Sequence, residues 1–137
     1  MGLMARFLVL AGVGLVVWIA ARSLRSYFDG AKVPNRFDPT DAGVDHSRKP
    51  LLVEFTSPFC YDCKLALPVL QELAHTHHAS LAVIDAKQRP DLAAKYGIRL
   101  TPTILVVDGR GGIRGGWLGN PPQHEVESVL LQALASA

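Results

Sequence analysis

Two cysteines, Cys60 and Cys63, are the residues of this sequence best suited to chemistry, because two thiols this close along a chain can form a reversible disulfide. They follow an apolar run with one carboxylate, Leu51 to Phe55, which predicts a buried strand. Ser57 and Pro58 then lead into apolar residues at helical spacing. The pair is therefore expected where a strand passes into a helix, with Cβ atoms about 5 to 6 Å apart, so that a disulfide opens and closes without rebuilding the fold.

The start of this helix distinguishes the two sulfurs. Unpaired N–H groups and the positive end of the helix dipole favour a thiolate at Cys60, and Lys64 adds a nearby positive charge. Asp62 acts in the opposite direction, because a carboxylate between two thiols disfavours the thiolate. Cys63 lies one turn deeper and is followed by apolar residues. We therefore expect Cys60 to attack a partner and Cys63 to act as the resolving sulfur.

Two further stretches resemble a known family. Lys95 to Gly111 (KYGIRLTPTILVVDGRG) closely resembles the region around the cis-proline of thioredoxins, and Cys63 to Pro68 (CKLALP) resembles the stretch that ends at their helix-kinking proline. With the C-x-x-C pair, the resemblance covers roughly Lys49 to Ala135, most of one domain. It implies an α/β thioredoxin-like fold, with a four- to five-stranded mixed sheet and helices on both faces.

The resemblance also implies roles for other residues of the site. Glu54 stands six residues before Cys60, where thioredoxins carry a buried acid that accepts the proton of the resolving cysteine. A carboxylate inside an apolar strand is expected to have a raised pKa. Thr101 and Pro102 match the residue pair that borders the dithiol and binds substrate backbone. The side chains that would give substrates an apolar surface are Phe59 and Tyr61.

Three departures from the family pattern bear on the redox potential. Phe59 replaces the family's tryptophan, Tyr61-Asp62 replaces its Gly-Pro dipeptide, and Val83 replaces a lysine often found in the next core strand. The sequence also lacks the Pro-His dipeptide of oxidase-type relatives. Together with Asp62, which destabilises a thiolate, this favours a reductant.

Segment 1–28 is expected to be a membrane anchor. The run Phe7 to Ala21 carries no charge, and the longer stretch Leu3 to Leu24 reaches about 33 Å as a helix, enough to cross a hydrocarbon core of roughly 30 Å. A cleaved signal peptide is one alternative, but its small-x-small site would be Ala21-Arg22-Ser23, which contains a charge. A buried core helix is another, but the run has no polar face. Aromatic residues that suit a membrane interface are Trp18, Tyr27 and Phe28.

The orientation of this anchor rests on the resemblance, because positive charges flank it on both sides: Arg6 before it, and Arg22, Arg25 and Lys32 after it. Membrane-tethered thioredoxin-like proteins of bacteria usually face outward. We therefore expect a single-pass protein of the bacterial cytoplasmic membrane, with its domain on the extracytoplasmic side. Residues 29–48, which include Pro34 and Pro39, are expected to be a polar tether, and residues 49–137 the domain.

Within the domain, apolar runs predict further strands at Leu81–Asp85, Thr103–Val107 and Ile113–Leu118, the last two joined by a glycine-rich turn. Helices are predicted at Pro90–Tyr96 and after Gly119. The segment before Leu51 leaves room for a four-stranded sheet with at most a short fifth strand.

No metal, organic cofactor or nucleic acid is expected. Three histidines follow the cysteines along the chain: His75, His77 and His78. With Cys60 and Cys63 they mimic the ligand order of a zinc finger, but they would lie about three helical turns or more from Cys63, too far to bind the same ion. The net charge of +2 is small and the basic residues form no long run, which disfavours nucleic acid.

The sequence thus predicts a thiol:disulfide oxidoreductase that exchanges disulfides with partner proteins through Cys60 and Cys63, more as a reductant than as an oxidant. With only two cysteines, another redox protein must recharge the pair. Two alternatives stay open at this point. One is a metallochaperone that holds copper or zinc through the dithiol, and the other is a thioredoxin-fold binding module without catalysis.

Overall fold

The computed structural model describes residues 2–29, 35–45 and 48–136, and divides the chain into two compact units, Met1–Lys32 and Val33–Ala137. The described part of the first unit forms one helix, α1 (Leu3–Asp29). Its stretch Leu3–Leu24 is long and apolar enough to cross a membrane, and none of it is buried against protein; a signal sequence has the same properties. Five residues named in the predictions for the anchor and the tether lie outside the described residues or side chains: Arg25, Tyr27, Phe28, Lys32 and Pro34.

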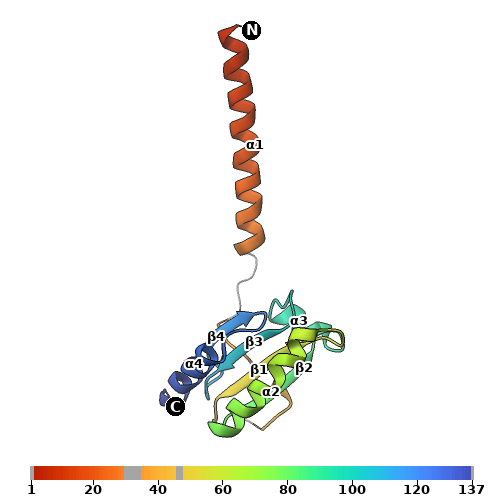
Figure 1. Cartoon of the computed structure of the whole chain (residues 1–137), viewed down its shortest axis with the longest axis vertical. Coiled ribbons are helices and arrows are strands. Elements are labelled where there is room, and N and C mark those ends of the chain that lie inside the picture. Colours follow the sequence, from red (N-terminus) through yellow and green to blue (C-terminus); the bar gives the residue numbers. More distant parts are fainter. Residues whose placement is uncertain (1, 30–34, 46–47, 137) are drawn as a thin grey trace. The chain divides into compact units, whose positions relative to one another are not determined.

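The second unit is built on a mixed four-stranded sheet with the strand order β2-β1-β3-β4 (Figure 1). Its strands are β1 (Leu51–Thr56), β2 (Ser80–Asp85), β3 (Thr103–Val107) and β4 (Ile113–Leu118). β1 and β2 are parallel, whereas β1 pairs with β3, and β3 with β4, in antiparallel register. In place of a fifth strand, the described residues form a single bridge between Arg36 and Gly112.

Helices cover both faces of this sheet because alternate side chains of each strand point to opposite sides. On one face, α2 (Tyr61–Thr76) packs on β1 and β2, and α4 (Gln123–Ala135) packs on β3 and β4. Leu52 of β1 belongs to this core. On the other face, Val53 and Phe55 pack with residues of α3 (Pro90–Lys95) and of the chain before β1. β1 is therefore buried on both sides, which explains why residues 51–55 are apolar apart from Glu54.

The chain before β1 is part of this unit, so the expected boundary between tether and domain needs correction. Phe37 is 1% exposed and stacks on Tyr96 with ring centroids 4.6 Å apart. Tyr96 also receives a hydrogen bond from the Asp38 backbone N–H at 2.9 Å and donates one to Asp41 at 2.5 Å, while Lys95 pairs with Asp41 at 2.6 Å. These contacts hold residues 37–41 on α3, whereas the expected tether ran to residue 48. The short 3₁₀ helix Pro39–Ala42 begins behind the Asp38 cap, as the Asp-Pro pair indicates.

Candidate active site

Cys60 and Cys63 lie at the amino end of α2 and are joined by a disulfide, with Cα atoms 5.3 Å apart. Cys60 is the N-cap residue rather than the first helical residue, and its Sγ accepts a hydrogen bond from the Cys63 backbone N–H at 3.2 Å. One free N–H group of the first helical turn, that of Cys63, is thus directed at the Cys60 sulfur. Cys60 is partly exposed, whereas Cys63 is only 3% exposed. This difference in access makes Cys60 the sulfur that another molecule can reach.

A second loop lies against the loop that carries the cysteines. Ser57 Oγ and Thr101 Oγ1 are 3.0 Å apart, which joins the residues after β1 to the residues before β3. The peptide bond between Thr101 and Pro102 is cis. Pro102 is buried, and its carbonyl accepts a hydrogen bond from the Gly119 N–H at 2.8 Å. Thr101 and Pro102 are therefore fixed next to the dithiol loop by contacts on both sides.

The residues on either side of Cys60 are the most exposed aromatic side chains of this loop. Phe59 is 92% exposed and Tyr61 is 73% exposed. The Lys87 Nζ atom lies over the Phe59 ring, 5.8 Å from its centroid. Sequence reasoning missed Lys87. The available signal was its place just after β2, because the carboxyl ends of the parallel strands β1 and β2 meet at one edge of the sheet.

Glu54 is buried in the middle of the sheet. It is 1% exposed, and neither of its carboxyl oxygens has a hydrogen-bond partner among the described residues. Burial in these apolar surroundings raises the pKa of Glu54 to about 7. The carboxyl group is therefore divided between its neutral and charged forms near neutral pH.

The register of the sheet places Glu54 on the face that α2 covers. Its antiparallel partner is Ile104, which packs with Ala66 and Leu70 of α2. On the parallel side Glu54 pairs with Val83, which is 47% exposed at the edge of the sheet. Because Cys63 is the buried residue of the first turn of α2, Glu54 and Cys63 lie on the same side of β1.

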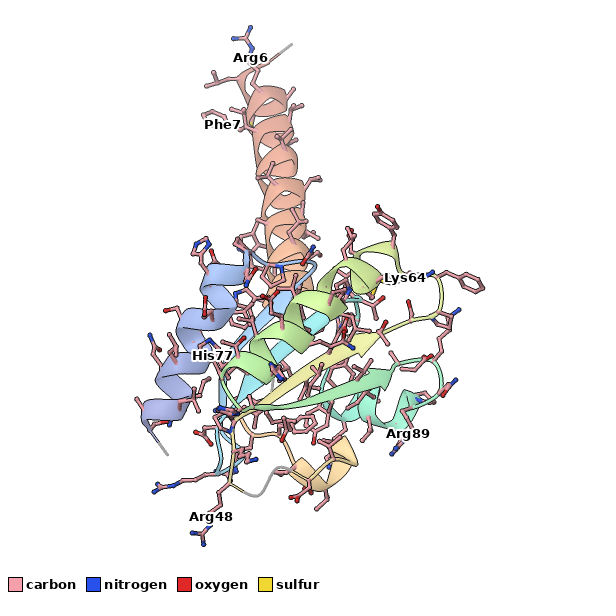
Figure 2. All side chains as sticks on the ribbon, turned by 60° about the horizontal axis from the view of Figure 1, so that its bottom comes forward. Arg6, Phe7, Arg48, Lys64, His77 and Arg89 are labelled. Carbon is pink, nitrogen blue, oxygen red and sulfur yellow. A yellow bond between two sulfur atoms is a disulfide. The ribbon has the colours of Figure 1, made fainter. Side chains whose placement is uncertain are left out.

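The histidines lie at the other end of α2. His77 caps the carboxyl end of the helix, and its Nε2 atom is 2.8 Å from Glu127 of α4. In the part of the chain that the structure describes, no three His, Cys, Asp or Glu side chains come together as a metal site. Figure 2 shows His77 and Arg48 at the end of the domain opposite to Lys64 of the first turn of α2.

The fold and the site define a small α/β domain that carries a disulfide-forming pair at the amino end of a helix, beside a cis-proline. The thioredoxin family model matches residues 34–130. Among curated proteins, the chain is 37% identical to the thioredoxin of Griffithsia pacifica over 65 residues, 46% of this chain and 60% of that protein. It is 34% identical to the thioredoxin of Porphyra purpurea over 84 residues, 59% of this chain and 77% of that protein.

Solved structures agree with this match. A point-mutant thioredoxin from Halobacterium salinarum aligns with a TM-score of 0.62 at 22% identity, over 72% of this chain and 86% of that one, which is evidence for the fold. Schistosoma mansoni thioredoxin aligns with a TM-score of 0.57 at 26% identity, over 64% of this chain and 80% of that one. The chain belongs to the thioredoxin family.

Proposed function

We propose that this chain is a thiol:disulfide oxidoreductase that reduces disulfides of partner proteins. The observation that carries the proposal is the disulfide between an accessible cysteine at a helix N-cap, Cys60, and a buried one, Cys63. A structural disulfide needs no such difference in access. A reversible dithiol needs this difference, because one sulfur must contact the partner while the other stays buried until the mixed disulfide has formed.

In the reduced form, the Cys60 thiolate attacks one sulfur of the partner disulfide. The partner S–S bond breaks, a mixed disulfide forms, and the first partner thiolate leaves and takes up a proton. The Cys63 thiolate then attacks the Cys60 sulfur and releases the second partner sulfur as a thiolate, which takes up a proton. Two electrons pass to the partner, and the Cys60–Cys63 disulfide is formed.

Glu54 is proposed to accept the proton of Cys63 before this second attack. A general base works best when its pKa lies near the working pH, and the pKa of Glu54 is about 7. Its position under α2, on the same side of the sheet as Cys63, supports the same role. Neither oxygen of the carboxyl group has a hydrogen-bond partner in the described structure, so the group is available for this proton.

The surface around Cys60 is proposed to receive an extended segment of the partner. Thr101 and Pro102 would lie beside the backbone of that segment, and the exposed rings of Phe59 and Tyr61 would contact its apolar side chains. The Tyr61-Asp62 dipeptide between the cysteines favours a reductant. The pair would then be recharged by another dithiol protein, most simply one in the membrane.

We also propose that α1 anchors the chain in a bacterial cytoplasmic membrane as a single span, with the domain on the extracytoplasmic side. The apolar stretch Leu3–Leu24 and the positive charges near both of its ends, Arg6 and Arg22, support an anchor. Protease added outside sealed cells should remove the domain. Full protection of the domain would contradict this orientation.

The proposed chemistry is tested by replacing each cysteine separately. Cys60→Ser should abolish reduction of a disulfide-linked peptide, and Cys63→Ser should accumulate mixed disulfides that non-reducing electrophoresis detects. The double variant supplies the baseline. Turnover retained in either single variant would rule out the assignment.

The redox potential of the chain then decides the direction of electron flow. A reversible couple near about −270 mV would mark a reductant, and one near about −120 mV an oxidant. Copper or zinc held tightly by the reduced chain, and lost in Cys60→Ser, would favour a metallochaperone instead. Function that persists in the double variant would indicate a binding module.

A further inference from the structure

Three segments of the domain meet around the dithiol: residues 57–64, 86–91 and 97–102. The parallel strands β1 and β2 end at the same edge of the sheet, and the antiparallel strand β3 begins there. The Ser57–Thr101 contact at 3.0 Å joins the first and third segments. The Lys87 ammonium group, 5.8 Å from the Phe59 ring centroid, joins the first and second.

These segments carry more exposed positive charge than negative charge. Arg89 and Asp91 neutralise each other in an ion pair of 3.0 Å. Three exposed cations remain and form no ion pair in the described parts of the chain; we call them the basic rim: Lys64, Lys87 and Arg99. Asp62 is the one exposed carboxylate of these segments that stays without a cationic partner there. Figure 2 shows Lys64 and Arg89 at the same end of the domain.

Lys87 is the member of the basic rim whose ammonium group contacts a neighbour of the reactive cysteine in the sequence. Its ammonium group lies over the ring of Phe59, the residue that directly precedes Cys60. Its backbone N–H is held by the Asp85 carboxylate at 2.8 Å, which sets the turn after β2. The cation therefore lies over the residue that precedes Cys60 and is still exposed to solvent.

Exposed apolar side chains belong to the same three segments as the basic rim. Phe59 is 92% exposed, Tyr61 73% and Leu100 54%, and all three belong to the segments around the dithiol. A partner segment that fits this surface has both apolar side chains and carboxylates close to its disulfide. Opposite charges placed this way raise the rate of encounter and suppress partners of the wrong sign.

We propose that the basic rim, with Lys87 as its main specificity residue, selects partner proteins whose reactive disulfide is flanked by carboxylates. This inference rests on the proposed disulfide reductase function and names the class of its substrates. The disulfide exchange itself is unchanged, because the basic rim affects which partner binds and not the reaction of Cys60 and Cys63 that follows.

The test uses the reduced 137-residue chain in a nonionic detergent and three disulfide-linked peptides of equal length. The peptides differ only in the residues flanking the disulfide, which are acidic, neutral or basic. Each rate is divided by the rate with dithiothreitol, because flanking charges also change the reactivity of the peptide disulfide itself. At low salt the corrected acidic-to-basic ratio should be about tenfold, and at about 0.5 M salt it should fall to within about twofold.

Charge reversal at one position shows whether the basic rim causes the preference for acidic peptides. Lys87→Glu should lower the acidic-to-basic ratio at least about threefold at low salt. The matched control is Lys49→Glu, an equal change of charge at an exposed position just before β1, at the opposite end of the sheet. Lys49→Glu should leave the ratio within about 1.5-fold of the wild-type value, because charges beyond a Debye length are screened.

The outcomes separate this inference from the function on which it rests. If none of the three peptides is reduced, both fail. If all three are reduced but the corrected ratio is one or lower, the inference fails and the reductase function stands. The inference also fails, and the reductase function stands, if Lys87→Glu changes the acidic-to-basic rate ratio no more than Lys49→Glu does. Circular dichroism of both variants establishes that they are folded.

Discussion

Two carboxyl groups among the described residues of the domain are almost fully buried, Glu54 at 1% and Asp108 at 7% exposure, but their surroundings are opposite. Asp108 lies in the turn between β3 and β4, where its Oδ1 atom accepts hydrogen bonds from the N–H groups of Arg110 and Gly112, each at 2.9 Å. Its Oδ2 atom accepts a hydrogen bond from Arg114 Nε at 2.7 Å. Neither oxygen of Glu54 has such a partner in the described structure.

The two environments move the two pKa values in opposite directions. Burial raises the pKa of Asp108, but the N–H groups of Gly112 and Arg110 and the Arg114 guanidinium outweigh it, so the pKa lies below its ordinary value. For Glu54 burial acts alone and raises the pKa to about 7. A carboxylate that organises a turn is thus fully paired and charged, whereas one without partners is ready to exchange a proton near neutral pH.

The largest effect expected from this difference is the pH dependence of stability caused by Glu54. Because its pKa rises from 4.5 to about 7 on folding, the folded state holds the proton more tightly. Its contribution to stability is therefore fully present below about pH 4.5, and about 3 kcal/mol is lost as the pH rises through 7. Urea unfolding of the oxidised chain from about pH 4 to 9 should show this slope in the wild type and not in Glu54→Gln. Equal slopes in both chains would contradict the shift.

A smaller effect is expected at Asp108. Asp108→Ala leaves the N–H groups of Arg110 and Gly112 without their acceptor and should lower the free energy of unfolding at neutral pH by about 2 kcal/mol. Asp108→Asn keeps an acceptor oxygen and should cost less. Since the pKa of Asp108 is lowered, its contribution is present above its ordinary value of 3.8 and is lost as the pH falls below it, opposite to Glu54. Urea unfolding at neutral pH and below about pH 4 checks both statements, and a loss under about 0.5 kcal/mol in Asp108→Ala would refute the first.

The strands could be predicted from the sequence because local signals bound them. The expected ranges Thr103–Val107 and Ile113–Leu118 are those of β3 and β4, since an apolar run and a glycine-rich turn each mark their ends. The position of Cys60 at the start of α2 followed in the same way from the Ser-Pro step. The resemblance to thioredoxins, carried by local motifs, is confirmed by the family match.

Other features depend on contacts between distant parts of the chain, and at most the order of the strands points to them. Phe37 is a single aromatic residue in a polar stretch, and its burial depends on stacking with Tyr96. Lys87 is one cation among many, and its place over Phe59 follows from how two loops meet. The roles of Glu54 and Cys63 in proton transfer stay predictions.

The smallest effect is expected from a substitution that gives Glu54 a neighbouring cation, as Asp108 has in Arg114. Val83 is in register with Glu54 on the neighbouring strand and is 47% exposed, so a lysine there can keep its stem at the surface and bring its ammonium group near the carboxyl. Val83→Lys should lower the pKa of Glu54 by about one unit, equivalent to about 1.4 kcal/mol. Carboxyl-carbon NMR titration of the oxidised chain measures this shift directly. Val83→Met is the matched control, since it has a similar length without a charge, and an equal fall in that variant would show that the charge is not the cause.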